Sequence, residues 1–211
     1  MLLRADILVG KKGKKIMEKI STLYKKDAND LSRVINELAS ENKWVIDGEG
    51  IPTRKFNGTA TAIIEGELYK RYDVKKGKQV PQNAIPCQEP DEITGHWPHW
   101  VKCDRNNQAD KWHFEGFDDL KNKENGTYEL CGEKVQGNPE HVNGHILVKH
   151  GIEILPVKDF SFDGLKNYLS NPELDIEGIV FHHKIDGRMC KIRKCDFGVK
   201  RVKAIHGQSQ N

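Results

Sequence analysis

Two β-prone runs joined by a Glu-Gly pair restrict the fold of this chain more than any other feature of its sequence. The stretch GTATAIIEGELYKRYD, residues 58–73, places β-branched and aromatic residues on both sides of Glu65-Gly66, which predicts two strands around a turn. Further strands are indicated by KWHFEGF, GTYELCGEKV and HILVKHG. A closing hairpin is predicted for EGIVFHHKIDGRMCKIRK, with Asp186-Gly187 as its turn. With a short helix in FDGLKNYLS, the sequence predicts a strand-rich α+β domain.

The N-terminal region has a different pattern, and residues 14–41 predict helix. In DANDLSRVINELAS, Asp30 is a candidate N-cap. The apolar residues that follow recur at i, i+3, i+4 and i+7, which predicts one packing face: Leu31, Val34, Ile35 and Leu38. We therefore expect a helical segment over residues 1–45 packed on the core, a single domain over residues 46–203 and a polar tail over residues 204–211.

Composition and the N-terminal sequence indicate the cellular location of this chain. Its 211 residues suit one domain of ordinary size, and no apolar run approaches the length that spans a membrane. The N-terminal MLLRADILVGKKGKK carries its basic residues after the short apolar patch and has no small-residue cleavage site, so it does not resemble a signal peptide. We expect a soluble cytoplasmic protein that does not bind membranes.

The cysteines favour reduced thiols over disulfides, because there are five of them and they form no Cys-x-x-Cys pair. One segment, CQEPDEITGHWPHWVKC, offers Cys87, His96, His99 and Cys103 as zinc ligands. Their spacing matches no common zinc pattern, so packing cysteines and a surface loop rich in His and Trp are the favoured interpretation.

A lone lysine, Lys55, precedes the first predicted strand in IPTRKFNGT, and three later islands follow a fixed order after it. They are TYELCGEKVQGNPE, DIEGIVFHH and MCKIRKCDFG. Four motifs therefore occur in order: Lys-x-x-Gly, an acidic residue inside a strand, Glu-Gly-Ile-Val-Phe, and a strand with alternating basic residues. This order resembles that of the superfamily of ATP-dependent polynucleotide ligases and capping enzymes. From about residue 50 to residue 202 the chain is most similar to the 5′-to-3′ RNA ligase family that has a vertebrate member.

The resemblance assigns Lys55 as the nucleophile that attacks the α-phosphorus of ATP. Its amine must then be neutral, and neighbouring cations in a partly desolvated pocket lower the pKa of a lysine. Lys191 and Arg193 are two residues apart, so on a strand both point to one face and can reach the α-phosphate, whereas Lys194 points away. The alternative is an edge strand with solvated basic side chains.

Two glutamates complete the expected site. The resemblance implies that Glu129 binds a ribose hydroxyl, with Tyr128 or Leu130 packing on the opposite face of its strand; a strand-end glutamate paired with a lysine is the alternative. It also implies that Glu177 binds Mg²⁺ through water or orients the lysine. Gly178 would remove a side chain where substrate or backbone must come close.

Other site residues follow from the same motifs. Gly58 belongs to the nucleotide-binding lysine motif, and the resemblance implies that Arg71 contacts phosphate, with Lys70 as the alternative. Asn57 departs from the family, in which Lys-x-Asp-Gly is the commonest form. An amide there would weaken metal binding if the acid normally organises Mg²⁺; otherwise Asn57 serves as a turn-former before Gly58.

The resemblance thus implies an antiparallel-sheet nucleotidyltransferase domain with flanking helices and no C-terminal OB domain. The expected function is a monomeric ATP-dependent RNA ligase that uses Mg²⁺, or Mn²⁺ in its place, to join 5′-phosphate and 3′-hydroxyl RNA ends. The basic stretches KKGKK and VKRVKAIHG, near the two termini, are expected to hold RNA. The alternatives are a GTP-using capping-type enzyme and a nucleotide or RNA-end binder that no longer forms the lysine adduct.

Overall fold

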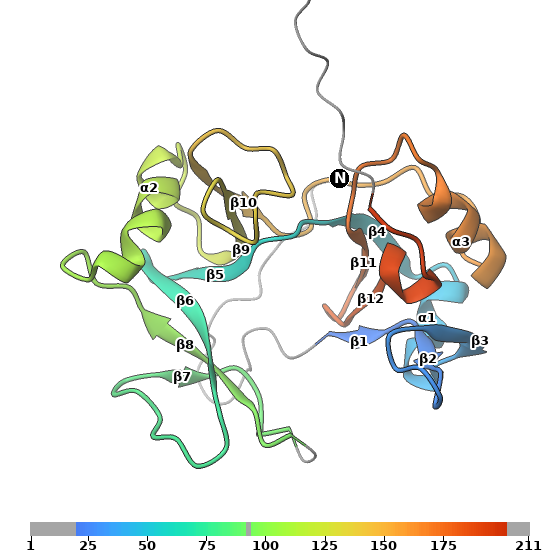
Figure 1. The fold of residues 1–211 in the computed structure, drawn as a ribbon, viewed down its shortest axis with the longest axis horizontal. Coiled ribbons are helices and arrows are strands. Elements are labelled where there is room, and N and C mark those ends of the chain that lie inside the picture. Colours follow the sequence, from blue (N-terminus) through green and yellow to red (C-terminus); the bar gives the residue numbers. More distant parts are fainter. Residues whose placement is uncertain (1–19, 92–93, 202–211) are drawn as a thin grey trace, which may run out of the picture. The chain divides into compact units, whose positions relative to one another are not determined.

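The computed structural model describes residues 20–91 and 94–201, and these form two compact units (Figure 1). The central unit comprises residues 57–150. The terminal unit comprises residues 20–56 together with residues 151–201. The chain therefore passes from one unit to the other after Phe56 and after His150, and these boundaries differ from the one expected after residue 45. The expected tail, 204–211, and the basic stretch KKGKK lie outside the described residues.

The central unit is built on one antiparallel sheet in the order β10-β9-β5-β6-β8-β7. Its strands are β5 (Thr59–Ile64), β6 (Glu67–Val74), β7 (Ile85–Pro86), β8 (Trp97–Lys102), β9 (Gly126–Gly132) and β10 (His145–Lys149). A 3-10 turn, η2 (Gln108–Asp110), leads into helix α2 (Lys111–Asp119). The strands predicted over GTATAIIEGELYKRYD, GTYELCGEKV and HILVKHG are thereby confirmed.

The strands of this sheet divide their side chains between two faces. One face packs with α2 in a buried cluster that includes Ile63, Leu68, Phe117, Tyr128 and Leu130. The other face carries a smaller cluster of Ala62, Ile64, Cys87 and Trp100. Because alternate residues of a strand point to opposite faces, the position of each polar side chain on these strands decides whether it lies beneath α2 or on the opposite side.

The terminal unit contains a four-stranded sheet in the order β1-β12-β11-β4, antiparallel except for the β1-β12 pair. These strands are β1 (Ser21–Thr22), β4 (Gly50–Lys55), β11 (Gly178–His183) and β12 (Met189–Arg193). The remaining elements are the hairpin strands β2 (Tyr24–Lys26) and β3 (Val34–Leu38), the 3-10 turns η1 (Ser40–Asn42) and η3 (Lys194–Phe197), and the helices α1 (Lys43–Ile46) and α3 (Phe162–Ser170). The helix predicted over FDGLKNYLS is confirmed as α3.

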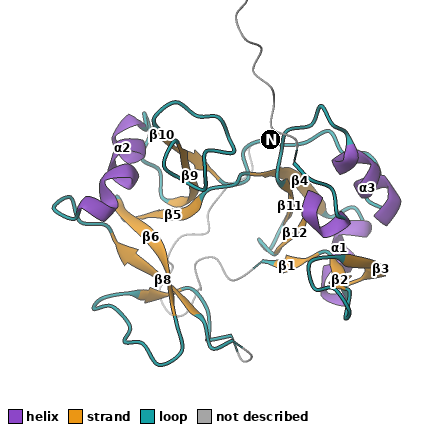
Figure 2. Cartoon of the chain, viewed as in Figure 1, coloured by secondary structure: helices purple, strands orange, loops and turns teal. Residues whose placement is uncertain are grey.

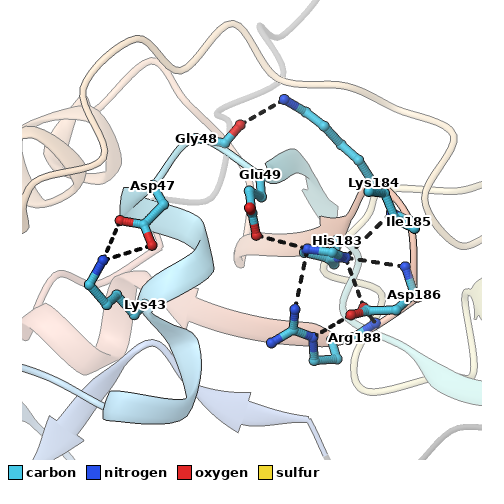
Figure 3. A network of polar contacts seen from close by, with 9 residues as sticks. All are labelled: Lys43, Asp47, Gly48, Glu49, His183, Lys184, Ile185, Asp186 and Arg188. Atoms are coloured by element: carbon cyan, nitrogen blue, oxygen red, sulfur yellow. Dashed lines mark hydrogen bonds and ion pairs between the residues drawn. The ribbon is translucent and has the colours of Figure 1, made fainter.

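The closing hairpin of β11 and β12 is confirmed as well, and a polar network holds its turn (Figure 3). Ring nitrogen Nδ1 of His183 accepts the backbone N–H of Asp186 at 3.2 Å, and Nε2 lies 3.0 Å from Oε2 of Glu49. Arg188 Nε donates to Asp186 Oδ2 at 2.7 Å. Gly187 has a φ of 76°, which glycine adopts without strain. The turn therefore fixes the register of β12, which carries Lys191, against β11, which begins directly after Glu177.

The helix expected over residues 14–41 is wrong wherever the structure describes it, from residue 20 onward. Residues 24–38 form a hairpin, in which Asp30 accepts the backbone N–H of Ser32 at 3.0 Å as part of a turn between the strands. Leu31 and Ile35 are exposed, at 72% and 38%, whereas Val34 is buried and Leu38 packs against the core, so the four residues do not share one packing face. Asp side chains that bond nearby backbone groups favour turns over helix, and the β-branched Val34 and Ile35 favour strand.

The strand expected over KWHFEGF is wrong too, because these residues form most of α2. Asn107 caps the preceding turn by accepting the backbone N–H of Ala109 at 3.0 Å. Helical spacing then buries Phe117, and Gly116 lets the helix approach β10 closely: a Cβ there would lie 3.0 Å from the carbonyl carbon of Ile146. The expected His/Trp surface loop is corrected as well, since His99 is fully buried in β8.

The fold is therefore of mixed α+β class with mainly antiparallel sheets and short helices (Figure 2). Within the described ranges, no helix has both the length and the apolar character needed to cross a membrane.

Candidate functional site

Lys55 and Glu177 meet at one end of the terminal sheet. Lys55 is the last residue of β4 and pairs with Gly178, the first residue of β11, so Glu177 lies just before its cross-strand neighbour. Nζ of Lys55 lies 2.6 Å from Oε2 of Glu177, and it also donates to the carbonyl oxygen of Phe56 at 3.2 Å. Both side chains remain accessible, with 22% and 19% of their surface exposed. The pair can therefore meet a ligand from solution.

The glycine of the Glu-Gly motif is required by the backbone of β12. A Cβ on Gly178 would lie 2.3 Å from the carbonyl oxygen of Ile192 and 2.7 Å from Cα of Arg193, distances too short for any side chain. The carbonyl oxygen of Glu177 accepts the backbone N–H of Lys194 at 3.0 Å. Close approach of backbone, one of the two reasons expected for this glycine, is confirmed, and it fixes Glu177 against the strand of basic residues.

Lys191 lies on β12, whose alternate residues Cys190 and Ile192 are fully buried in the core of the terminal unit. Burial lowers the pKa of Lys191 below its ordinary value, and the charges of Arg193 and Lys55 lower it further, against the opposing effect of Glu177. The structure thus brings Lys55, Glu177, Lys191 and Arg193 together. A half-buried cation with cationic neighbours gains from an anion, because an anion offsets both the burial and the repulsion.

Arg193 is held by its own carboxylate partner. Its Nη2 donates to Asp196 Oδ1 at 2.9 Å and its Nε to Oδ2 at 3.2 Å, while Lys26 Nζ lies 2.7 Å from the same Oδ1. Asp196 is fully buried. Lys194, in contrast, is buried and donates to the carbonyl oxygen of Asn171 at 3.2 Å. Asp196 therefore fixes the orientation of Arg193, whereas the ammonium of Lys194, the first residue of η3, is held by a backbone carbonyl.

In the central unit, Glu129 is the centre of a hydrogen-bonded chain. Its Oε1 accepts the backbone N–H of Gly58 at 3.0 Å, and its Oε2 lies 2.9 Å from Nε2 of His150. Nδ1 of His150 in turn lies 3.0 Å from Oγ1 of Thr127. The expected packing of Tyr128 and Leu130 on the opposite face is confirmed, since both are buried in the cluster beneath α2. The partner of Glu129 is thus a histidine and a backbone amide, not a lysine.

Gly58 lies against β9. A Cβ on it would be 2.1 Å from the carbonyl oxygen of Leu130, so no other residue fits without moving the strand. The backbone N–H of Asn57 donates to Glu140 Oε1 at 2.8 Å. Neither Asn57 nor Gly58 has a positive φ. The pair therefore does not form the left-handed turn that Asn-Gly often makes. Two carboxylates, Glu129 and Glu140, hold the segment that follows Lys55.

Arg71 and Lys70 point to opposite faces of β6. Lys70 pairs with the buried carboxylate of Asp110, on the face that α2 covers. Arg71 pairs in register with Trp100 and lies on the face opposite α2, with its Nε 3.6 Å from Oδ1 of Asp73. Glu129 also lies on this face, because its neighbours Tyr128 and Leu130 do not. The structure therefore separates the two alternatives and leaves Arg71 on the side of Glu129.

Three further residues hold these side chains in place and were not expected from the sequence: His150, Glu140 and Asp196. Glu140 and Asp196 lie inside two of the stretches that carry the resemblance, TYELCGEKVQGNPE and MCKIRKCDFG, and His150 lies in the predicted strand segment HILVKHG. Strand alternation could not identify them, because none of the three belongs to a strand. A hollow of about 350 Å³ beside β2, between residues 21–26 and 39–41, contains none of the predicted site residues.

No protein-family profile matches the chain, and no curated protein matches it at a significant level.

Proposed function

We propose that this chain is an ATP-dependent RNA ligase that joins 5′-phosphate and 3′-hydroxyl RNA ends through a lysyl-AMP intermediate. The observation that carries the proposal is the contact of Lys55 with Glu177, 2.6 Å apart, beside the half-buried cation of Lys191. A nucleophilic lysine needs a group that takes its proton and a cation that receives the charge of the reacting phosphate. This cluster contains both.

In the first step the amine of Lys55 attacks the α-phosphorus of ATP. The new nitrogen–phosphorus bond forms as the bond to the pyrophosphate oxygen breaks, and pyrophosphate leaves. Before the attack the ammonium must lose a proton, and Oε2 of Glu177 lies at hydrogen-bond distance to accept it. Glu177 would therefore act as an orienting group for the lysine and as the first acceptor of its proton.

Lys191 and Arg193 would bind the α-phosphate. Negative charge on the phosphoryl oxygens increases during the displacement, and cations fixed in a partly dehydrated site stabilise that charge without reorganising. Arg193 is preorganised by its two hydrogen bonds to Asp196. Lys191 gains most, because the phosphate offsets the burial that lowers its pKa.

The residues present fit a magnesium ion of the kind that phosphoryl-transfer enzymes use. Such ions are held by one or two carboxylates together with substrate phosphates and waters. Glu177 is the accessible carboxylate of the Lys55 cluster, since Asp196 is buried against Arg193 and Lys26. Glu177 would hold the ion with the phosphates of ATP, and the ion would supply neutralisation of charge on the leaving pyrophosphate.

Two further transfers complete the reaction. AMP passes from Lys55 to the 5′-phosphate of an RNA end, which forms a phosphoanhydride and frees the lysine. A 3′-hydroxyl then attacks the adenylylated phosphate, AMP leaves and the phosphodiester forms. Glu129 would accept a hydrogen bond from a ribose hydroxyl, since a carboxylate with two partners retains free lone pairs. Arg71, on the same face of the sheet, would contact phosphate.

The experiment that tests this function incubates the chain with Mg²⁺, an RNA carrying a 5′-phosphate and 3′-hydroxyl, and either ATP or GTP labelled at the α-phosphate. We expect label on the protein from ATP, its transfer to the 5′-phosphate RNA and a sealed product. Label from GTP alone would identify a capping-type enzyme. Absence of label from both nucleotides, with nucleotide still bound, would identify a binder and contradict the proposal.

A further inference from the structure

We infer that Cys103, Asp110 and His113 form a binding site for a zinc ion in the central unit. One candidate ligand atom from each side chain lies within 4.8 Å of the other two. In the part of the chain that the structure describes, this is the one group of three or more such side chains so arranged. It shares no residue with the Lys55 cluster, and the inference does not depend on the proposed ligase function.

The local fold brings the three side chains together from residues 103–113. Cys103 follows the end of β8, and its backbone N–H donates to the carbonyl oxygen of Leu68 at 2.9 Å. The chain then turns back, and the backbone N–H of Asp104 donates to Asp110 Oδ2 at 3.0 Å. His113 lies in the first turn of α2, which begins at Lys111, directly after Asp110. The site therefore connects β8 with the start of the helix.

The donor set selects the class of metal. A thiolate, an imidazole and a carboxylate together suit zinc and related transition metals, whereas magnesium and calcium prefer oxygen ligands alone. Donors on one tetrahedral zinc ion lie roughly 3.5 Å apart, given zinc bonds of about 2.0–2.3 Å. Side-chain shifts of about 1 Å would bring the three atoms to that separation. A water molecule would take the fourth position.

His113 supplies an independent reason for a ligand. Both of its ring nitrogens are buried and have no hydrogen-bond partner among the described residues. A neutral imidazole has one N–H and one lone pair, and a buried polar group without a partner costs about 1–3 kcal/mol. A metal ion at one ring nitrogen would use the lone pair and remove that part of the penalty.

Lys70 is the group that zinc must displace. Its ammonium pairs with Oδ1 of Asp110, so a cation already lies beside this carboxylate. The Lys70 side chain is 21% exposed, so the core does not enclose it. Burial raises the pKa of the free Cys103 thiol to about 12, so the thiol is protonated at neutral pH. Formation of the sulfur–zinc bond must release that proton to solvent.

The test uses tag-free protein in a non-thiol reductant and titrates cobalt(II) as a spectroscopic substitute for zinc. We expect one equivalent to bind, with the intense visible bands of tetrahedral cobalt and a thiolate-to-cobalt charge-transfer band, and zinc to displace it. Cys103→Ser should lose the charge-transfer band. Cys87→Ser, which changes another buried cysteine of the same unit, should keep it. Lys70→Gln should bind zinc at least about tenfold more tightly, because the competing ammonium is gone.

Three results would overturn the inference. They are no stoichiometric cobalt binding by the unaltered chain, a charge-transfer band that survives in Cys103→Ser, or weaker zinc binding by Lys70→Gln. If Cys103→Ser does not fold, as shown by circular dichroism, His113→Asn decides in its place, since it must lose the tetrahedral spectrum. Zinc should also raise the unfolding temperature of the unaltered chain, because a ligand that binds only the folded state stabilises it.

Discussion

Asp196 holds the guanidinium of Arg193 through two hydrogen bonds, of 2.9 and 3.2 Å, while its own side chain is fully buried. A buried carboxylate of this kind stabilises the fold only as long as it is ionised. The Asp196–Arg193 pair should therefore both stabilise the terminal unit and orient Arg193, which we expect to bind phosphate.

The first prediction concerns the acid stability of this pair. Burial raises the pKa of Asp196, but hydrogen bonds from Arg193 and Lys26 outweigh it, so the pKa lies below its ordinary value of 3.8. The stabilisation is present above that value and is lost as the pH falls through the lower, folded-state pKa. Asp196→Asn should lower the free energy of unfolding by about 2 kcal/mol at neutral pH, the value typical of hydrogen bonds to a charged group. This difference should shrink below about pH 4 in urea denaturation curves; a difference that stays constant down to acid pH would contradict it.

The second prediction is a gain of stability with a loss of activity. The pKa of Lys191 is lowered, which means that its charged form is less favourable in the folded state than in the unfolded state. This penalty is complete below the folded-state pKa and disappears as the pH rises through the unfolded value of about 10.4. Lys191→Met should therefore raise the unfolding temperature at neutral pH while reducing adenylylation by at least about a hundredfold. Lys166→Met, which changes an exposed lysine of α3 in the same unit, is the control. A less stable Lys191→Met would refute the electrostatic argument.

The third prediction concerns His150 as a positioning residue for Glu129. The 2.9 Å contact of its Nε2 with Oε2 should fix the carboxylate that we expect to bind ribose. His150→Phe should raise the ATP concentration for half-maximal adenylylation roughly tenfold, the effect of losing a hydrogen bond to a charged group, with little change in the maximal rate. It should also reduce the preference for ATP over an ATP analogue that lacks a ribose hydroxyl. An unchanged preference together with a lower maximal rate would show a different role.

The fourth prediction concerns Asn57, which departs from the acid of related motifs. If that acid organises magnesium, the amide keeps the shape and loses the charge. Sealing of preadenylylated RNA should then require more Mg²⁺ in the unaltered chain than in Asn57→Asp, measured as a magnesium titration under single-turnover conditions. Asn57→Ala, which also lacks the charge, should behave like the unaltered chain. Superimposable curves for the unaltered chain and the Asn57→Asp variant would exclude a metal role.

The sequence predicted the elements whose signals are local. The strands around Glu65-Gly66 and the hairpin turn at Asp186-Gly187 depend on glycine at positive φ, with values of 79° and 76°. Alternation along β9 correctly separated Glu129 from Tyr128. Along β12, the buried Cys190 and Ile192 alternate with Lys191 and Arg193. These predictions succeeded because a two-residue period decides the face of a strand without knowledge of its partners.

The predictions that were wrong concern segments in which turns, caps and strand pairing override the local sequence pattern. Leu31, Val34, Ile35 and Leu38 have helical spacing, yet the turns made by Asp27 and Asp30 and the pairing of β2 with β3 override it. The aromatic residues of KWHFEGF read as a strand, whereas a capped turn before them starts α2. His150 and Glu140 could not be placed, because their roles depend on partners that are distant in the sequence.

The central claim is that Lys55 is the nucleophile, and the fifth prediction tests it by the intact mass of the purified chain after incubation with ATP and Mg²⁺. We expect the mass to increase by one adenylyl group and peptide mapping to place that group on Lys55. Lys55→Arg, which keeps a positive charge beside Glu177 but cannot lose its proton, should fold normally and show no increase. No increase in the unaltered chain, or an adduct that persists in Lys55→Arg, would contradict the account.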